Sequence, residues 1–508
     1  QMSLEYYNGM DCVATWLVAQ EEMKRLKAEG LWEAFFRFGQ PLLPILEEWR
    51  RVGLRVDLER AVLFKRFTER RLHLAEKAIA ELMGVLFNPY SPKQVAEFLY
   101  EKCKLPVQYN ETHKGERRPS VDYEARKKLR EYIAKHPRPE WEQAGRLLEL
   151  LDFLHGEKKK LEYFGRISPD GRIHPYFKAH GEETFRLSST PNVQNWSKAD
   201  ITVWGGSRRH ATGRSPIGEE NLPKMGSLRS IVLPDDDDSV ILSCDFSQIQ
   251  LWIYAKIWNV KWLLAAYEKG DYLYGLVYEA LYKRPFFQEG KPRTKKNMRP
   301  EVTESEILRT KAVPLGFMFG RSGRSVAEEY GWPPEEGEAL RKWWFSLNPE
   351  IPASHDRIAY EVRQKGYVRH VFGQKLYYPA GGVTEAINSY AQSNEAFIVN
   401  ESTILIHEEL KRRGLRARVM LSLHDQLLFS VDERQLIEVY EEVVKPILER
   451  PIKELGGFVF RHNAEVSPAW DWETLDYAEW KRQFECSGPI CCARARREKA
   501  QQGLPGLP

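Results

Sequence analysis

Two apolar segments each carry an aspartate where a buried strand is expected, and this feature constrains the fold most strongly. The segment "VILSCDFSQIQLWIY" (240–254) runs from a β pattern into Asp245 and then into a helical pattern. The segment "MLSLHDQLLFSV" (420–431) reads as a buried strand with His424 and Asp425 at its centre. Burying a lone carboxylate is costly unless a partner compensates it. The sequence therefore predicts one shared site for Asp245 and Asp425.

Such a shared site favours divalent cations. Two carboxylates that point at one place repel each other, and cations relieve that repulsion. Two ions about 4 Å apart can activate a hydroxyl and stabilise a leaving pyrophosphate. An all-oxygen site suits Mg²⁺, whereas Zn²⁺ prefers Cys or His ligands. We therefore expect two Mg²⁺ ions, with Mn²⁺ as a substitute.

A third segment, "EILRTKAVPLGFMFGRSGRS" (306–325), supplies positive charge. Lys311, Leu315 and Phe319 are four residues apart, so a helix would place them on one face. That face offers a cation for a triphosphate and an apolar surface for a base. Taken alone, the segment is better read as an ordinary amphipathic helix.

The remaining pattern is mainly helical, with short β segments. Gly53 marks a turn and a short strand inside the helical block 38–86, and Ser91 with Pro92 marks a helix start. The acidic run Asp235–Asp238 is read as a solvated hairpin turn inside a β region. The other expected elements are helices at 12–35, 123–164, 255–365, 384–412 and 433–449, an exposed loop at 107–120, a β-rich segment at 366–379 and a disordered tail at 486–508.

Composition sets broad limits. The 508 residues predict two to four domains, and a net charge of +4 does not exclude a nucleic-acid partner. The six cysteines form no disulfide framework, which favours a reducing, cytoplasmic setting. No apolar run approaches the roughly 18 residues that span a bilayer, so we expect no membrane partner. The 29% of charged residues would suit a thermostable protein.

The three segments, in this order, resemble the polymerase motifs of family A DNA polymerases, the bacterial polymerase I type. "DFSQIQLW" is similar to the first motif, "KAVPLGFMFG" to the second and "HDQ" to the third. "FRLSSTPNVQNW" (185–196), "SLRSIVLP" and the thumb-like "GLRVD", "SPKQVAEFLYEKCKLP" and "KKKLEYF" add to the resemblance, which covers about residues 38–475. A single motif is moderately specific, whereas the ordered set is strongly specific.

The resemblance implies an α+β fold shaped like a right hand. It also implies a monomer that uses primer–template DNA and dNTPs. The expected units are an exonuclease-domain remnant (1–36), a thumb region (37–165), a first part of the palm (166–254), fingers (255–380), a second part of the palm (381–485) and the tail (486–508).

The resemblance further implies template-directed transfer of a nucleotide to a primer 3′-hydroxyl, with release of pyrophosphate. Asp245, Asp425 and the Phe246 carbonyl would hold the metal ions, while Lys311 and His424 would act at the triphosphate and the primer end. The residues implied for dNTP binding are Phe246, Gln248, Gln250, Arg309, Lys311, Leu315 and Phe319. The residues implied for DNA binding are Lys158, Lys160, Arg186, Asn192, Gln194, Asn195, Arg229, Asn388 and Gln392.

The N-terminal "YNGMD" looks like the last motif of the 3′–5′ exonuclease domain that precedes such polymerases. Tyr7 would orient a water and Asp11 would bind a metal. Because an exonuclease needs a fuller carboxylate cluster, we expect no proofreading from this chain.

Several positions depart from the family pattern. Gln250 stands where a glutamate usually blocks a ribose 2′-hydroxyl, and Phe319 stands where a tyrosine usually holds that glutamate. We expect somewhat weaker sugar discrimination, and discrimination against chain terminators because Leu315 replaces an aromatic residue. Arg309 is expected to compensate for Ile307, which replaces an arginine. Together the departures suggest a divergent lineage, such as a phage or viral one.

Three other readings stay open. A catalytically dead, DNA-binding relative is disfavoured by the presence of Asp245, Lys311 and Asp425. A single-subunit RNA polymerase shares the three motifs, but the "RLSS…PNVQN" segment favours the DNA enzyme. Reverse transcription is a possible side activity that the sequence does not decide.

Overall fold

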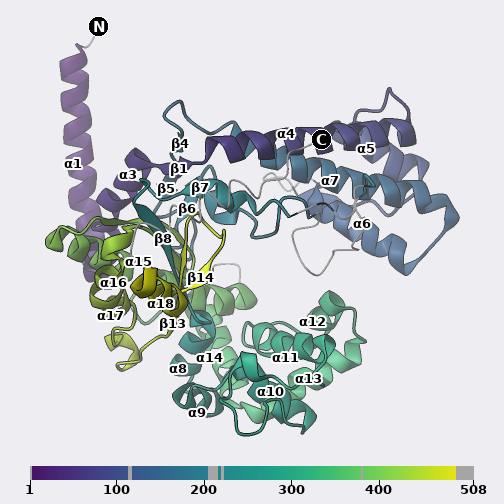
Figure 1. Ribbon diagram of the computed structural model, residues 1–508. Coiled ribbons are helices and arrows are strands. Elements are labelled where there is room, and N and C mark those ends of the chain that lie inside the picture. Colours follow the sequence, from purple (N-terminus) through teal and green to yellow (C-terminus); the bar gives the residue numbers. More distant parts are fainter. Residues whose placement is uncertain are drawn as a thin grey trace.

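The computed structural model describes residues 3–111, 117–203, 216–218, 222, 224–378 and 382–487. Helices surround a central sheet (Figure 1), which confirms the α+β expectation. The last described helix, α18 (Tyr477–Ser487), continues into the segment expected to be a disordered tail, so that prediction is wrong for residues 486 and 487. Residues 488–508 lie outside the described part of the chain.

The central sheet is five-stranded and antiparallel, in the order β11–β12–β8–β13–β14. Its two faces differ in chemistry because side chains alternate along a strand. Leu242 shares one face with Phe429 and Val466, whereas Ser243 and Asp245 lie on the opposite face. The strands are β8 (Ser239–Phe246), β11 (Ala417–Leu423), β12 (Gln426–Asp432), β13 (His462–Ser467) and β14 (Leu475–Asp476).

Helices that pack around this sheet form the main apolar core. The long helix α15 (Val383–Arg413) contacts α8 (Ile249–Ile257), β11 and α3 (Leu42–Val52). Short helices α16 (Leu436–Glu438) and α17 (Lys445–Leu448), joined by a π-helical turn, follow β12. The expected helices at 384–412 and 433–449 are therefore confirmed.

One helical arm extends from the sheet at the upper right of Figure 1 and has an apolar core of its own. Its helices are α4 (Leu58–Met83), α5 (Pro92–Ala96), α6 (Tyr123–Lys135) and α7 (Glu142–Phe164). Ser91 caps α5 and Pro92 opens it, as predicted. The segment 107–120 is not a plain loop, because β2 (Tyr109–Glu111) pairs with β3 (Arg117–Pro119). We name α4–α7 the upper arm.

A second helical arm lies at the lower right of Figure 1. Its helices are α9 (Lys261–Lys269), α10 (Leu273–Tyr282), α11 (Glu304–Phe317), α12 (Gly323–Tyr330), α13 (Pro334–Leu347) and α14 (Glu350–Lys365). Trp344 is fully buried within it. The β-rich segment is also confirmed, as the pair β9 (Tyr367–Arg369) and β10 (Lys375–Tyr377).

A small sheet of order β4–β1–β7 joins the upper arm to the centre. Its strands are β1 (Leu54–Val56), β4 (Arg172–Ile173) and β7 (Val232–Leu233); a separate pair consists of β5 (Tyr176–Lys178) and β6 (Ser188–Thr190). Gly53 precedes β1 with φ +71°, and a Cβ there would lie 2.7 Å from the His174 ring. The predicted turn and strand are therefore confirmed.

The acidic run 235–238 does not close a hairpin. β7 pairs with β1, whereas β8 pairs with β12 and β13, so the run links two different sheets. Contrary to the expectation, the Asp235 carboxylate also does not face solvent but pairs with two arginines. It lies 3.1 Å from Arg172 Nη1 and 2.8 Å from Arg418 Nη2. The sequence pattern did not show these distant cations.

The first helix, α1 (Leu4–Ala28), has no buried residue and projects from the molecule at the left of Figure 1. A three-residue helix, α2 (Trp32–Ala34), connects it to the main core. Among the described helices, none has the length and low charge that a bilayer span requires.

Candidate active site

The two predicted aspartates converge at one end of the central sheet. Asp245 ends the apolar run of β8 and lies in register with Gln426 at the start of β12. The Phe246 amide donates a hydrogen bond to the Asp425 carbonyl oxygen at 3.0 Å. Residues far apart in the sequence are thus neighbours, as predicted. The segment 420–431 is not one buried strand, however, because His424 and Asp425 form the turn between β11 and β12.

Burial and mutual repulsion make this pair electrostatically expensive. Burial, and then the charge of Asp425, raise the pKa of Asp245 to about 7. Burial also raises the pKa of Asp425, although His424, Arg186 and Lys198 oppose this. A divalent cation would relieve both effects.

The donor set at this position fits a hard cation. Two carboxylates and neighbouring backbone carbonyls provide only oxygen ligands, which suits Mg²⁺ or Mn²⁺. Within the described ranges, no group of three or more His, Cys, Asp or Glu side chains is arranged to hold a metal. Bound ions here would therefore keep several water or substrate ligands, as Mg²⁺ does.

Backbone strain gathers around the same pair. His424 and Gln248 both have φ +57°, in the left-handed region that side chains other than glycine rarely adopt. Both also carry a buried polar atom, His424 Nδ1 and Gln248 Oε1, with no hydrogen-bond partner among the described residues. Strained and unpaired groups of this kind cluster at functional sites. Burial lowers the pKa of His424, so its ring is neutral near pH 7.

A buried carboxylate that the sequence analysis missed lies behind the site. Glu395 on α15 is fully buried, and its Oε2 accepts hydrogen bonds from Gln250 Nε2 at 2.6 Å and Arg186 Nη2 at 2.7 Å. Burial raises the pKa of Glu395 to about 7, and the charge of Asp425 contributes. A charged residue within the apolar stretch "SNEAFIV" was a usable signal, of the same kind that identified Asp425.

Helix α11 carries the predicted cation and an exposed apolar residue. Lys311 Nζ lies 5.9 Å from the centre of the Tyr274 ring, and Leu315 is 42% exposed. The helix ends at Phe317, so Phe319 falls in the following turn, where its ring packs edge-on against Tyr254. The structure thus places Lys311 and Leu315, but not Phe319, on α11.

Arg309 differs from the expectation that it compensates for Ile307. Its Nε lies 2.8 Å from Glu336 Oε1 on α13, and its guanidinium stacks near the Trp332 ring. Two residues along a helix correspond to about 200° of rotation, which turns Arg309 away from the Lys311 face. A role in dNTP binding is therefore not supported for Arg309 in this arrangement.

The residues expected to bind DNA divide into two groups. The first group, Arg186, Asn388 and Gln392, lies near the aspartates. Arg186 donates a hydrogen bond to Glu395. Asn388 and Gln392 precede Glu395 on α15 by seven and three residues, so a helix places them on the same side. Asn192 and Asn195 are exposed, and the Asn192 side chain accepts a hydrogen bond from the Asn195 amide.

Gln194 and Arg229 belong to the second group, because both are buried and already paired. Gln194 Nε2 donates to the Ser422 carbonyl at 2.9 Å. Arg229 donates to the Trp196 carbonyl and forms an ion pair with Asp471 at 2.9 Å. Both side chains therefore hold the wall of the site together, and the direct DNA contact expected of them stays a prediction.

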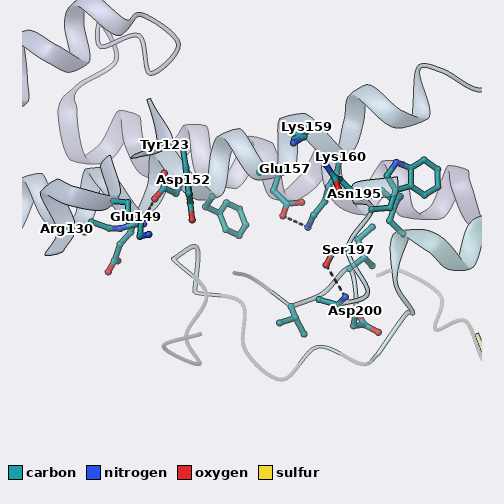
Figure 2. Close-up of a pocket in the computed structure, with 18 of the residues that line it drawn as sticks. Tyr123, Arg130, Glu149, Asp152, Glu157, Lys159, Lys160, Asn195, Ser197 and Asp200 are labelled. Carbon is teal, nitrogen blue, oxygen red and sulfur yellow. Dashed lines mark hydrogen bonds and ion pairs between the residues drawn. The ribbon is translucent and has the colours of Figure 1, made fainter. Parts of the chain in front are cut away.

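A cavity of about 830 Å³ lies between α6, α7 and residues 195–203, away from the aspartate pair (Figure 2). Lys159 and Lys160 line it, together with Arg130 and Asn195. Lys160 does not extend freely, because its Nζ lies 2.8 Å from Glu157 Oε1 and the side chain is only 25% exposed. Burial lowers the pKa of Lys160. Lys158 is exposed and lies over the Tyr90 ring at 4.4 Å.

Comparisons with known proteins agree with this arrangement. The family model for DNA polymerase family A matches residues 61–470. DNA polymerase I of Streptococcus pneumoniae serotype 4 is 27% identical over 467 residues, covering 88% of this chain and 48% of the relative. DNA polymerase I of Bacillus caldotenax is 26% identical over 453 residues, covering 86% and 46%. The chain thus spans about half the length of these curated relatives.

A solved structure shows the same fold. The POL domain of Pol1 from M. smegmatis, in complex with DNA primer-template and dNTP, has a TM-score of 0.68 at 22% identity, covering 88% of this chain and 73% of that chain. The match to the family model extends over more than half of the 508 residues. Paired aspartates at adjacent strand ends and a family-wide match over the surrounding fold lead to one conclusion: this chain belongs to DNA polymerase family A.

Proposed function

We propose that this chain is a template-directed DNA polymerase that adds dNTPs to a primer 3′-hydroxyl and releases pyrophosphate. The observation that carries the proposal is the meeting of Asp245 and Asp425 at the end of the central sheet, joined by the hydrogen bond from the Phe246 amide to the Asp425 carbonyl. Support also comes from the solved relative, whose structure includes DNA primer-template and dNTP.

Asp245, Asp425 and the Phe246 carbonyl would hold two Mg²⁺ ions. Bound there, the ions would lower the pKa of the primer hydroxyl and neutralise charge on the departing pyrophosphate. The protein's own contribution is a pair of carboxylates whose pKa values are raised, because burial outweighs the opposing charges nearby. His424, held at positive φ beside Asp425 and with a lowered pKa, would contact the primer end.

The incoming dNTP would lie against α11. Lys311 would stabilise the triphosphate charge, and the exposed side chain of Leu315 would contact the base. Gln248 and Gln250 approach from the start of α8, so Gln250 would border the sugar. Gln250 is held by Glu395 rather than by Phe319, because Phe319 has no hydroxyl group.

Primer–template DNA would follow the upper arm and the site. Arg186, Asn388 and Gln392 would contact the minor groove, whose acceptors are nearly alike for every base pair. Lys158 and Lys160 would contact the DNA backbone, as the resemblance implies. Lys159 and Asn195 line the α6–α7 cavity together with Lys160 and would contact the same backbone. We assign the upper arm to the thumb, the second helical arm (α9–α14) to the fingers and the central sheet to the palm.

Hydrolysis in the 3′–5′ direction is not proposed for the described residues. Tyr7 and Asp11 lie on α1, whose side chains are exposed. An exonuclease needs a fuller carboxylate cluster than this pair, so the absence of proofreading stays an expectation for this chain.

Primer extension tests the proposal directly. The full chain is incubated with a primed DNA template, dNTPs and Mg²⁺, with Asp245→Asn as the matched variant. We expect extension by the parent and a loss of at least 10³-fold in the variant. A parent that binds the primer–template but does not extend it would instead support the DNA-binding relative.

Parallel reactions separate the remaining alternatives. Replacing dNTPs by NTPs on DNA without a primer would reveal an RNA polymerase. Replacing the DNA template by RNA would reveal reverse transcription. Extension only with dNTPs on primed DNA is the result that the proposed function predicts.

A further inference from the structure

Glu395 is the most unusual side chain near the site. It lies in the middle of α15 among buried apolar residues such as Ala391, Ala396 and Phe397, and it is itself 0% exposed. Its Oε2 accepts two hydrogen bonds, whereas its Oε1 has no partner among the described residues. Burying a carboxylate with one unpaired oxygen is costly. The packing of α15 alone therefore does not explain why a glutamate stands at this position.

The two donors come from different sides of the site. Gln250 belongs to α8, which follows the β8 aspartate, whereas Arg186 belongs to the segment just before β6. One carboxylate oxygen therefore ties a side chain near the proposed nucleotide to a side chain near the proposed primer end. The Arg186 guanidinium is only 14% exposed, so the pair is largely shielded from water.

We propose that Glu395 is a positioning residue that fixes the side chain of Gln250, and with it the discrimination between deoxyribose and ribose. The inference rests on the proposed function, under which Gln250 borders the sugar of the incoming nucleotide. A glutamine amide rotates freely unless something holds it, and the neighbouring Phe319 offers no hydrogen bond. Glu395 supplies that hold through the 2.6 Å bond to Gln250 Nε2, so the bulk that excludes a 2′-hydroxyl stays in place.

The test compares two substrates on one preparation of enzyme. kcat and KM are measured for dGTP and GTP insertion by the parent, Glu395→Ala and Glu395→Gln, and the ratio of the two kcat/KM values is calculated. This ratio does not depend on the fraction of folded enzyme. We expect Glu395→Ala to lower the ratio roughly tenfold, because a hydrogen bond to a charged group is lost. Glu395→Gln keeps one acceptor oxygen, so its ratio should lie between that of the parent and that of Glu395→Ala.

A double-mutant cycle shows whether Glu395 acts through Gln250. In a Gln250→Ala background, removing Glu395 should change the ratio by less than about twofold, because the positioned side chain is already absent. Thr403→Val is the matched control: Thr403 is buried on the same helix and donates to the Val399 carbonyl, two turns beyond Glu395. It should leave the ratio unchanged.

The inference is overturned if Glu395→Ala keeps the parent ratio, or if its effect is undiminished in the Gln250→Ala background. Should Glu395→Ala not fold, Glu395→Gln carries the comparison alone, and an unchanged ratio again overturns the inference. A parent that incorporates neither dGTP nor GTP would overturn the proposed function itself, a result distinct from a failure at Glu395.

Discussion

Asp245 illustrates how a single residue can serve function at the expense of stability. In the folded protein its pKa is raised to about 7, first by burial and then by Asp425, whereas an unfolded chain ionises an aspartate near pH 4. Between these values the folded state keeps a proton that the unfolded chain has lost. Stability of the metal-free protein therefore falls as pH rises from about 4 to 7 and stays reduced above that.

Replacing Asp245 by Asn should remove this penalty. We expect metal-free Asp245→Asn to be more stable than the parent at pH 8 by on the order of 2–4 kcal/mol. The gain should shrink towards zero near pH 4, where the parent carboxyl is protonated. Thermal melts in EDTA at pH 5, 6.5 and 8 measure it, with the 81% exposed Asp237→Asn as control. A gain that does not vary with pH would show that ionisation of the buried Asp245 carboxyl is not its cause.

Among the elements, helix α11 carries two cations, Arg309 and Lys311, on different faces and with different neighbours. Arg309 is paired with Glu336 on α13, and both side chains are about one-third exposed. Such a pair contributes at most about 1 kcal/mol to stability. Lys311 lies on the other face, near the Tyr274 ring.

We expect Lys311→Ala and Arg309→Ala to have different effects. Lys311→Ala should reduce kcat/KM for a dNTP by roughly 100-fold or more, because a cation that stabilises the triphosphate is lost. Arg309→Ala should change KM by less than about twofold. Glu336→Ala should reproduce the small effect of Arg309→Ala. Steady-state single-nucleotide insertion measures all three, and a KM increase in Arg309→Ala alone would restore a nucleotide-binding role for that residue.

The link between the small sheet and the central sheet depends on Asp235. Burial alone would raise the pKa of Asp235, but hydrogen bonds and charges from Arg418 and Arg172 outweigh it and lower the pKa. Its contribution to stability is therefore present above pH 4 and is lost as pH falls through the lowered pKa.

Asp235→Asn should leave two arginines without their shared partner. We expect destabilisation of on the order of 3 kcal/mol at pH 7. The neighbouring Asp237→Asn, whose ion pair with Arg55 is mostly exposed, should cost less than about 1 kcal/mol. Urea unfolding at pH 7 and pH 3 measures the free energy of unfolding of both variants and of the parent. Equal, small losses would show that the run is the solvated turn that its sequence suggested.

These elements also show which features a sequence can predict. Local signals identified Gly53, the Ser91 cap and the strand β8 that carries Asp245, because hydrophobic periodicity and turn chemistry act over a few residues. They missed the turn that interrupts 420–431 at Asp425. The partners of Asp235, Arg309 and Glu395 depend on elements distant in sequence. A pattern along one strand or helix does not specify which other element packs against it.

At the level of the whole molecule, two apolar cores meet at a charged junction. The core of the upper arm is separate from the main core. Between them Glu157, only 1% exposed, lies 2.8 Å from Lys160 and 3.6 Å from Arg71. Arg71 also donates to the carbonyl oxygen of Ile201, a residue that lines the α6–α7 cavity. The junction therefore sets how the arm is held against the rest of the protein.

Neutralising Glu157 should loosen that junction. In Glu157→Gln the buried Arg71 and the half-buried Lys160 lose a negative charge that they share, an effect of on the order of 3 kcal/mol. Because the arm has its own core, we expect it to open as a unit: amides of α4 and α7 should exchange faster with deuterium, while those of β8 and β12 stay protected. Primer–template affinity should fall in parallel. Glu162→Gln, an exposed glutamate on the same helix, is the control. Uniformly faster exchange in both cores would mean that the arm and the central sheet unfold as one body.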